Sequence, residues 1–325
     1  MQLLLSGDFD TAEQAEWAQA LHAALPAHRL WLHRDEAPDP AAIAVAIVAN
    51  PEPGSLIGLP GLRLIQSLWA GVDRLLADPT LPPGVPLARM VDPAMNAAMA
   101  ETALWAVLSL QRGFFTYARQ QQQSRWRQQP QCRADEWPVL LLGHGQMGQA
   151  VAAVLARQGY PVTAWRRSAV GPADAIAAAP APAAAGGVTV ISAPDALAAA
   201  RARARVVVNL LPLTADTRGL IDARWLAAMA PGAGLVNLAR GAHLVEADLL
   251  AALASGQIGQ AVLDVFQTEP LPAGHAFWQH PQITVLPHAA AMTDARSAAA
   301  AVAANVQALA SGRPIANLVA RQAGY

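Results

Sequence analysis

The chain has 325 residues, of which 54% are hydrophobic and 14% are charged, and its formal net charge is -1. This composition excludes a disordered chain and provides a sizeable core, and the near-zero charge gives no general attraction to nucleic acid or to an anionic membrane. All 22 basic residues are arginine, which excludes Walker-type phosphate binding, Schiff-base chemistry and pyridoxal-phosphate chemistry because each needs a lysine.

Cysteine usage and the apolar stretches predict the compartment. Cys132 is the single cysteine, so no internal disulfide can form, which is typical of a reducing compartment. The first residues, MQLLLSGDFD, lack a basic leader, and the most apolar stretches are interrupted by Pro, Asp or Arg. We therefore expect a cytoplasmic protein without a membrane span. We also expect no metal site, because His and Cys residues show no ligand spacing.

The first 98 residues alternate strand and helix patterns. Strands are predicted at residues 2–5, 30–32, 43–48 and 62–68, with a helix at residues 11–24. This alternation is typical of an α/β domain with a parallel sheet. The last strand leads into Trp69, Ala70, Gly71 and Val72, whose backbone N–H groups could hold an anion at the carboxyl end of the sheet. A plain strand-to-helix turn with Asp73 near the cap fits the spacing equally well.

A single long helix is predicted at residues 97–123, which would be about 40 Å long at 1.5 Å per residue. The polar, Pro-bounded tract at residues 125–138 follows it and is interpreted as a linker. The density of aromatic residues between Phe114 and Trp137 suits an interface, so we expect any homodimer to use this helix and segment.

A glycine-rich loop follows the strand pattern at residues 139–142. Gly143, Gly145 and Gly148 form G-x-G-x-x-G, and a helical pattern follows at residues 149–158. The glycines would permit a tight turn, close approach of the backbone to a pyrophosphate, and close packing of helix on strand. The helix N-terminus would add free N–H groups and a partial positive charge. The sequence therefore predicts a dinucleotide site, and a plain strand-to-helix turn is the alternative.

The next predicted strand, at residues 161–165, ends in Arg166, Arg167 and Ser168. An acidic residue about 20 positions after such a loop binds the ribose 2′-hydroxyl and selects NAD. Here two guanidinium groups and a hydroxyl stand there instead, and Arg binds phosphate in a bidentate manner. We therefore expect NADP(H) to be preferred, with NAD(H) left open as the alternative.

The remaining residues continue the alternation. Helices are predicted at residues 195–204, 221–229, 245–255 and 294–310, and strands at 205–211, 235–238, 260–265 and 283–286. Arg240, Glu269 and His288 each follow a strand, so they should lie on the same sheet edge as the glycine loop. An arginine can bind a carboxylate and polarise a neighbouring carbonyl, a histidine can supply a proton, and a carboxylate can orient that histidine. This set suits reduction of a 2-keto acid.

Several motifs together resemble the D-isomer-specific 2-hydroxyacid dehydrogenases over essentially the whole chain. They are the glycine loop, the stretches Asn237–Gly241, Leu263–Phe266 with Glu269-Pro270, and Pro287–Ala290. Within this family the chain is similar to the glyoxylate/hydroxypyruvate reductase A subgroup, through Leu68–Asp73, Asn209–Pro212, His243–Asp248 and the Ala323-Gly324-Tyr325 end. The resemblance implies NADPH-dependent reduction of glyoxylate to glycolate and of hydroxypyruvate to D-glycerate.

The resemblance also implies residue roles. Arg240 would bind the 2-keto acid, His288 would be the acid/base, Glu269 would pair with His288, and Trp69 to Val72 would line the substrate side. Cofactor contacts are implied at Gly143, Gly145, Gln146, Met147, Gly148, Arg166, Arg167, Ser168, Leu211, Pro212, Thr217, Ala239, Asp264 and Ala290. The subgroup often has Gly at the position of Trp69 and an aromatic residue near Ala49-Asn50, so the natural 2-keto acid stays open.

The fold expected is α/β, with two Rossmann-like or flavodoxin-like doubly wound parallel-sheet domains and an active-site cleft between them. Residues 1–98 with 290–325 would form the substrate-binding domain, and residues 99–289 the dinucleotide-binding domain. A cofactor-sensing binding protein built on the same core, and a 2-hydroxyacid dehydrogenase with another substrate, are the competing functions.

Overall fold

The computed structural model describes residues 1–167, 187–322 and 324. The chain forms two compact units, one of Met1–Met95 with Thr293–Tyr325 and the other of Asn96–Met292. These boundaries lie three residues from the predicted ones at each crossing. The chain therefore leaves the first unit within a helix and returns to it just before its last helix.

The sheet of the first unit has five strands in the order β2-β1-β3-β4-β5, and every pairing is parallel. The strands are β1 (Gln2–Gly7), β2 (Arg29–Trp31), β3 (Ile43–Ala49), β4 (Leu64–Ser67) and β5 (Leu87–Ala88). This is the flavodoxin-like order. All seven residues of β3 are buried, as expected for a central strand that is covered on both faces.

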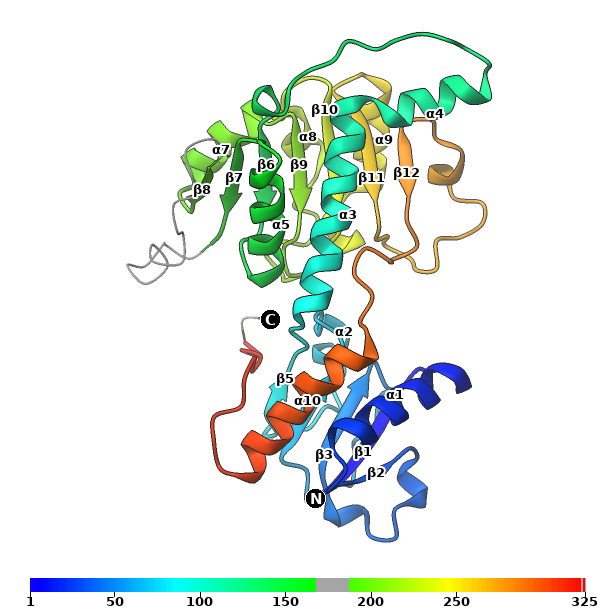
Figure 1. The fold of residues 1–325 in the computed structure, drawn as a ribbon, viewed down its shortest axis with the longest axis vertical. Helices are drawn as coiled ribbons and strands as arrows, with labels where there is room; N and C mark the ends of the chain where they lie inside the picture. The colour runs from blue at the N-terminus through cyan, green and yellow to red at the C-terminus, as the bar shows by residue number, and fades with distance from the viewer. Residues whose placement is uncertain (168–186, 323, 325) are drawn as a thin grey trace. The chain divides into compact units, whose positions relative to one another are not determined.

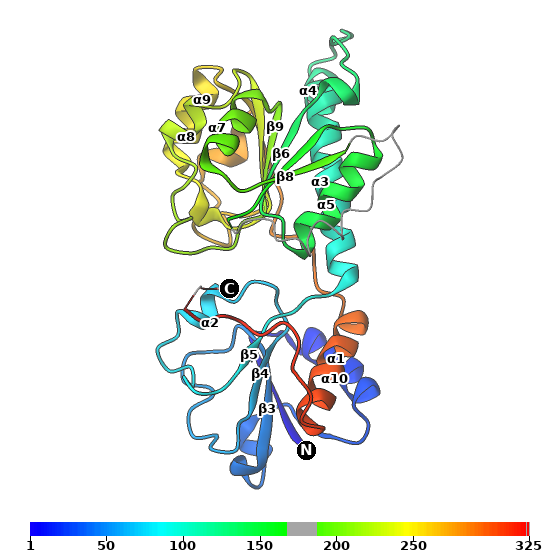
Figure 2. The same ribbon diagram turned by 90° about the vertical axis from the view of Figure 1, so that its left-hand side faces the viewer.

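The helices of this unit are α1 (Thr11–Ala24), α2 (Asp73–Leu76) and α10 (Ala295–Ala310), with short 3-10 turns η1 (Arg34–Glu36) and η2 (Pro40–Ala42). The Asp10 carboxylate accepts the N–H groups of Ala12 and Glu13 and so begins α1, at a stabilisation of about 1 kcal/mol. Helices α1 and α10 lie side by side on the sheet (Figures 1 and 2). The C-terminal segment then pairs with β5 through Val319 N–H to the Leu87 carbonyl, 2.8 Å.

The second unit contains seven parallel strands in the order β12-β11-β10-β9-β6-β7-β8. The strands are β6 (Val139–Leu142), β7 (Val162–Trp165), β8 (Val188–Ile191), β9 (Val206–Asn209), β10 (Ala233–Asn237), β11 (Ile258–Leu263) and β12 (Ile283–Val285). The strand order reverses between β6 and β9. Ligands of doubly wound folds bind at such a switch point, outside the carboxyl ends of the strands.

Helices cover both faces of this sheet. Figure 2 shows α3 (Pro93–Arg112) and α5 (Gln146–Arg157) on one face, and α7 (Pro194–Arg203), α8 (Ala223–Ala227) and α9 (Glu246–Ala254) on the other. Helix α4 (Phe114–Gln122) continues beyond α3, and the 3-10 turns are η3 (Ala134–Glu136), η4 (Gly241–His243) and η5 (Ala276–Gln279). Both units are therefore the doubly wound α/β folds that the sequence predicts.

Some sequence-based elements were wrong. The single helix at residues 97–123 is two helices, because Gly113 adopts a left-handed φ of 70° between α3 and α4. Helix α5 begins at Gln146, three residues earlier than predicted. Strand β5 was not predicted because it has only two residues, and β8 was not predicted because Thr189 interrupts its apolar run after an Ala-, Pro- and Gly-rich stretch. Among the described residues, no helix has the length and apolarity needed to cross a membrane.

Candidate active site

Most of the predicted site residues lie at the carboxyl edge of the sheet in the second unit. Because all seven strands are parallel, the segments that follow them leave the sheet at one edge. The residues that follow β6, β7, β9, β10, β11 and β12, respectively, include Gly143, Arg166, Leu211, Arg240, Glu269 and His288. Residues that lie up to 145 positions apart in sequence are thus placed along one edge of the sheet.

The glycine loop has the geometry of a close turn. Gly143 has a φ of 104°, and a Cβ on it would lie 2.9 Å from the Leu210 carbonyl oxygen. A Cβ on Gly148 would lie 2.2 Å from the Gly143 carbonyl oxygen, so any side chain there would push α5 off the strand. Gly145 is the N-cap of α5 and has open space around it, and Gln146 and Met147 form the first turn. The first-turn N–H groups have no helical partner and suit an anion.

Arg166 and Arg167 follow β7, the strand beside β6. The Arg166 N–H donates to the Ile191 carbonyl at 3.0 Å, which fixes the turn against β8. The Arg167 guanidinium lies 3.5 Å from the Asp216 carboxylate, and about half of the Arg167 side chain is exposed. This places Arg167 next to the segment that contains Thr217. The third predicted residue of this turn, Ser168, lies outside the described residues.

A histidine and a glutamate form a close pair at this edge. His288 Nδ1 lies 2.7 Å from Glu269 Oε2, with the two side chains 50% and 35% exposed. The Phe266 N–H donates to the other Glu269 oxygen at 2.8 Å, which fixes the carboxylate. The His288 backbone has a left-handed φ of 54°, and its N–H donates to the Asp264 carbonyl at 2.8 Å. The imidazole therefore has a defined orientation, with Nε2 directed away from the glutamate.

Asp264 stabilises the loop that carries the histidine. Its carboxylate is 1% exposed and accepts the N–H groups of Ala289 at 2.7 Å and Ala290 at 3.1 Å. The Ala290 carbonyl in turn accepts the Thr102 hydroxyl at 2.8 Å. Burial raises the pKa of the Asp264 carboxyl above its usual value, although the two N–H donors and the charge of His288 oppose that rise. Asp264 and Ala290, which were predicted as cofactor contacts, therefore also support the His288 loop.

The pair favours its charged form. The hydrogen bond to Glu269 raises the pKa of His288 above 6.5, although burial and the positive charge of Arg240 oppose the rise. Burial acts to raise the pKa of Glu269, but the hydrogen bonds from His288 and from the Phe266 N–H outweigh it and leave the pKa below 4.5. Between these two pKa values the imidazolium and the carboxylate coexist. The positive charge of Arg240 lowers the pKa of both groups, so it favours the carboxylate of Glu269 and opposes the imidazolium of His288.

Arg240 follows β10. Its Nη1 donates to the Ala239 carbonyl at 2.7 Å, and its own carbonyl accepts the Asn237 side-chain amide at 3.0 Å. The next residue, Gly241, packs against the loop after β11: a Cβ there would lie 1.9 Å from the Phe266 carbonyl carbon. The loops after β10 and β11 are therefore in direct contact, which positions Arg240 relative to the loop of Glu269.

The loop after β9 contains three further predicted residues. The buried Leu211 donates its N–H to the Asn209 side chain at 3.2 Å, and the Thr217 hydroxyl donates to the Pro212 carbonyl at 2.8 Å. This loop adjoins the glycine loop, since the Leu210 N–H donates to the Leu142 carbonyl at 2.8 Å. Its position fits the predicted contact with a dinucleotide.

The predicted residues Trp69 to Val72 belong to the first unit, where they connect β4 to α2. The Trp69 N–H donates to the Ser67 hydroxyl at 3.0 Å, so this N–H is not one of the anion donors that the sequence suggested. The Trp69 ring makes an edge-to-face contact with buried Trp17 at 6.4 Å. Within the described residues, no hydrogen bond uses the N–H groups of Ala70, Gly71 or Val72. Those three groups are the available donors of this turn.

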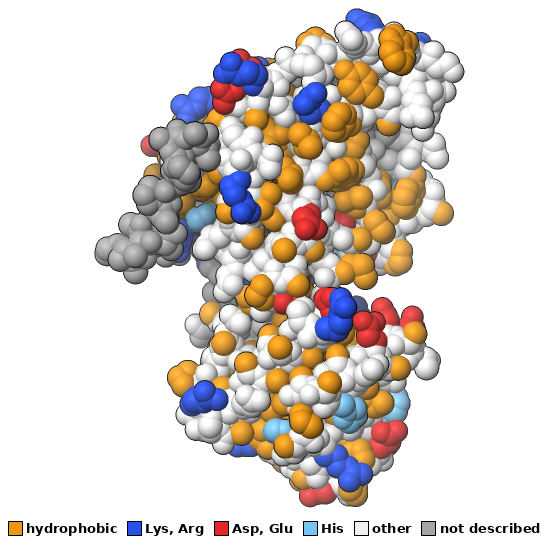
Figure 3. All heavy atoms as spheres, in the orientation of Figure 1, with side chains coloured by type: hydrophobic (Ala, Val, Ile, Leu, Met, Phe, Trp, Pro, Cys, Tyr) orange, Lys and Arg blue, Asp and Glu red, His pale blue; other side chains and the backbone are white. Residues whose placement is uncertain are grey.

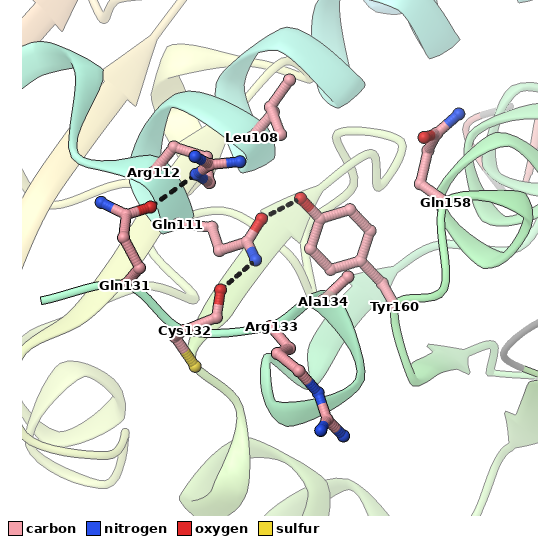
Figure 4. A pocket seen from close by; sticks show the side chains of 9 residues that line it. All are labelled: Leu108, Gln111, Arg112, Gln131, Cys132, Arg133, Ala134, Gln158 and Tyr160. Atoms are coloured by element: carbon pink, nitrogen blue, oxygen red, sulfur yellow. Dashed lines mark hydrogen bonds between the residues drawn. The ribbon is translucent and has the colours of Figure 1, made fainter.

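A cavity of about 420 Å³ lies elsewhere in the second unit (Figure 4). It is formed by the ends of α3 and α5 and by the residues just before β6 and β7, which is the amino edge of the sheet. The buried Tyr160 is one of its lining residues and donates its hydroxyl hydrogen to Gln111 Oε1 at 2.6 Å. The cavity is therefore separate from the carboxyl edge, where the histidine and the glycine loop lie.

Comparison with known proteins decides the family. The model of the NAD-binding domain of D-isomer specific 2-hydroxyacid dehydrogenases matches residues 104–290. The chain belongs to this family. It is 39% identical over the full length of both chains to a glyoxylate/hydroxypyruvate reductase A of Serratia proteamaculans.

Solved structures of this dehydrogenase family resemble the whole chain. One is a family member from Xanthobacter autotrophicus Py2 in complex with NADPH and MES, with a TM-score of 0.90, 36% identity, and coverage of 100% of this chain and 99% of that one. Another is an NADPH-dependent glyoxylate/hydroxypyruvate reductase of Sinorhizobium meliloti in complex with NADP and sulfate, with a TM-score of 0.88, 31% identity and the same coverage. The predicted family and fold are thus confirmed.

The sequence of this dehydrogenase predicts no individual role for three of its buried polar residues. Asn209 and Asn237 are the last residues of β9 and β10, and His243 lies in η4, and all three are 0% exposed. The sequence feature that could have identified two of them is the asparagine that ends each of the apolar strands β9 and β10. Among the described residues, no group of three or more His, Cys, Asp or Glu side chains has an arrangement that could hold a metal.

Proposed function

We propose that this chain is an NADPH-dependent reductase of small 2-keto acids, which converts glyoxylate to glycolate and hydroxypyruvate to D-glycerate. The His288–Glu269 pair, 2.7 Å apart on the same sheet edge as Arg240 and the glycine loop, carries this proposal. The names of the relatives, and the NADPH and NADP in the similar structures, support the same substrates and cofactor.

The residues at this edge fit a dinucleotide. Gly143 and Gly148 occupy positions where a Cβ would collide with the backbone, and Gly145 leaves open space above the first turn of α5, where a pyrophosphate would bind. When bound, NADPH supplies the hydride that the reduction needs. Cofactor contacts are proposed at Gly143, Gly145, Gln146, Met147, Gly148, Arg166, Arg167, Ser168, Leu211, Pro212, Thr217, Ala239, Asp264 and Ala290.

The protein side of the mechanism follows from three charged groups. Arg240 binds the substrate carboxylate and polarises the keto group. His288, protonated and held by Glu269, donates the proton from Nε2 to the keto oxygen while C2 accepts the hydride. The Glu269 carboxylate stabilises the imidazolium before transfer. In this proposal the first unit is the substrate-binding domain, and the N–H groups of Ala70, Gly71 and Val72 contribute to carboxylate binding.

A panel of 2-keto acids with NADPH and with NADH tests the proposal. The expected result is turnover of glyoxylate and hydroxypyruvate that is faster with NADPH. Trp69 packs on Trp17 and directly precedes the proposed N–H donors Ala70 to Val72, and if it selects a different 2-keto acid, the panel shows higher kcat/KM for that compound. Binding of NADPH without turnover of any 2-keto acid would instead support a cofactor-sensing protein and would contradict the proposal.

The double substitution Arg166→Ala with Arg167→Ala is expected to reduce the preference for NADPH over NADH by about tenfold or more. Two charge-assisted hydrogen bonds to a 2′-phosphate would be lost, each worth about 1.5–3 kcal/mol at most, and about 1.4 kcal/mol corresponds to a tenfold change in affinity. The measurement is the ratio of kcat/KM values for the two cofactors. Arg157→Ala, at the other end of α5, is the control. An unchanged ratio in the double variant would locate the phosphate site elsewhere.

Glu269→Gln is expected to move the alkaline limb of the pH profile for reduction to lower pH. Reduction needs protonated His288, and Glu269 raises the pKa of that histidine, so activity persists to a higher pH when the carboxylate is present. Without the charge, activity falls at a lower pH as pH rises. The measurement is kcat/KM against pH. Glu246→Gln is the matched control, because Glu246 pairs with His275 at 3.2 Å and not with His288. An unmoved profile for Glu269→Gln would reduce Glu269 to a structural role.

We further propose that the protein forms a homodimer in the cytoplasm through α3, α4 and the segment up to Trp137. Apolar side chains gather over α3 and α4 in Figure 3, and Trp105, Leu108 and Phe114 are each at least 36% exposed. Exposed aromatic residues among polar ones suit an interface. The cytoplasmic part of the proposal rests on the single, unpaired Cys132.

The dimer is expected to appear as the main species in sedimentation at micromolar concentration, and Phe114→Glu is expected to shift it toward monomer. A buried charge at the interface would be unpaired and costly. Trp278→Glu is the control, since Trp278 is equally exposed at 46% but lies in η5. A wild-type monomer at this concentration would rule the dimer out.

A further inference from the structure

Asn209, Asn237 and His243 form a buried polar cluster between the carboxyl ends of β9 and β10, and none of the three touches solvent. Burying a polar side chain is unfavourable unless its hydrogen-bonding groups are satisfied. Three adjacent buried polar side chains at the ends of the otherwise apolar strands β9 and β10 therefore require an explanation.

The hydrogen bonds of Asn209 determine which groups of the cluster donate and which accept. Its Oδ1 accepts the Leu211 N–H at 3.2 Å, which assigns the other amide atom as nitrogen. That nitrogen donates to Asn237 Oδ1 at 3.0 Å and lies 2.9 Å from His243 Nδ1. Since an amide nitrogen only donates, His243 Nδ1 is the acceptor and the imidazole hydrogen is on Nε2. His243 Nε2 then donates to the Pro212 carbonyl at 3.3 Å.

The cluster forms hydrogen bonds with the backbone of two loops. On one side, Asn237 accepts the Ala239 N–H at 3.3 Å and donates to the Arg240 carbonyl at 3.0 Å. On the other side, the Pro212 carbonyl that receives His243 also receives the Thr217 hydroxyl at 2.8 Å. The loop after β9 and the loop after β10 are therefore joined by directed bonds, whereas apolar packing alone would allow them to slide.

We infer that Asn209, Asn237 and His243 are positioning residues that hold the cofactor-side loop at Pro212 and the substrate-side guanidinium of Arg240 in one fixed arrangement. The inference rests on the proposed function, because it assigns these loops to NADPH and to the 2-keto acid. None of the three side chains touches a ligand in this account. They act through the backbone of Pro212 and Arg240, and small misplacements of such groups have large effects on rate and binding.

Two substitutions of His243 distinguish its hydrogen bond with Asn209 from its hydrogen bond with the Pro212 carbonyl. His243→Asn keeps an acceptor near Nδ1 for Asn209 but loses the bond to the Pro212 carbonyl, and KM for NADPH is expected to rise about tenfold with a smaller change in KM for glyoxylate. His243→Gln keeps a donor near Nε2 for Pro212 and is expected to recover most of that loss. Asn237→Asp removes the donor to the Arg240 carbonyl, and the larger rise is expected in KM for glyoxylate.

The experiment measures KM, kcat and the thermal unfolding midpoint of the full chain, and it also measures NADPH affinity by fluorescence titration. His280→Asn is the control, because His280 lies before β12 at the opposite edge of the sheet. Should His243→Asn fail to fold, Asn237→Asp tests the same cluster from its other side, and an unchanged KM for glyoxylate in the folded Asn237→Asp protein would overturn the inference.

A lower unfolding midpoint with unchanged KM values in the folded His243→Asn protein would overturn the inference and leave the cluster a purely structural feature. Equal losses in His243→Asn and His243→Gln would do the same, since the Pro212 bond would then not be the cause. If the wild type turned over no 2-keto acid while His243→Asn still weakened NADPH binding, the proposed function would fail and the positioning role toward the cofactor loop would stand.

Discussion

Replacing His288 by alanine is expected to lower kcat for glyoxylate reduction by about 10²–10⁴-fold, the usual contribution of a positioned general acid. His288 Nδ1 is held by Glu269 at 2.7 Å and the pKa of the imidazole is raised, so the wild-type ring is charged and oriented when the keto oxygen needs a proton. KM should change much less, because Arg240 still binds the carboxylate. Steady-state kinetics with saturating NADPH measure both quantities.

His280→Ala serves as the control for this prediction, since that histidine lies at the amino end of β12 while His288 follows the carboxyl end of the same strand. The NADPH affinity of His288→Ala should remain close to that of the wild type, which would show that the loop after β12 is still folded. A near-wild-type kcat in His288→Ala would mean that another group donates the proton.

Replacing Arg240 by alanine is expected to raise KM for the 2-keto acid strongly, by about 10²-fold, and to lower kcat as well. A guanidinium that binds the substrate carboxylate contributes in the ground state and in the transition state, so both constants should respond. Each charge-assisted hydrogen bond of this bidentate contact is worth about 1.5–3 kcal/mol, so its loss accounts for an effect of this size. The measurement is KM and kcat for glyoxylate.

Arg240→Lys separates charge from geometry, because lysine restores the charge but lacks the planar fork, and only a partial recovery is expected. Added guanidinium salt should also restore part of the activity of Arg240→Ala. A variant Arg240→Ala with unchanged KM would show that the carboxylate is bound elsewhere, and the N–H groups of Ala70 to Val72 would then be the first candidates.

Much of the second unit could be predicted because its signals are local. An apolar run, three glycines with fixed spacing and a helical pattern define a strand, a turn and a helix without knowledge of the rest of the chain. Once the strands are known to be parallel, Arg240, Glu269 and His288 must lie at one edge, and the structure brings His288 and Glu269 to 2.7 Å. Topology therefore connects local patterns to a shared site.

Other features depend on contacts that local patterns do not contain. Gly113 divides the long helix because its backbone adopts a left-handed conformation. The sequence did not predict this break, because a single glycine inside a helical pattern is often tolerated. The Trp69 N–H binds a hydroxyl two residues away, which spacing alone could not distinguish from an anion donor. His243 and the two asparagines acquire their roles from bonds across 28 and 34 positions of sequence.

The most direct test of the account uses NADPH that carries deuterium at both C4 positions of the nicotinamide. Incubation of the wild-type protein with this cofactor and glyoxylate should yield glycolate with one deuterium on C2, in an amount equal to the NADPH consumed, and the yield should fall with His288→Ala. Glycolate without deuterium, or NADPH binding with no glycolate formed, would contradict hydride transfer to a 2-keto acid as the function of this protein.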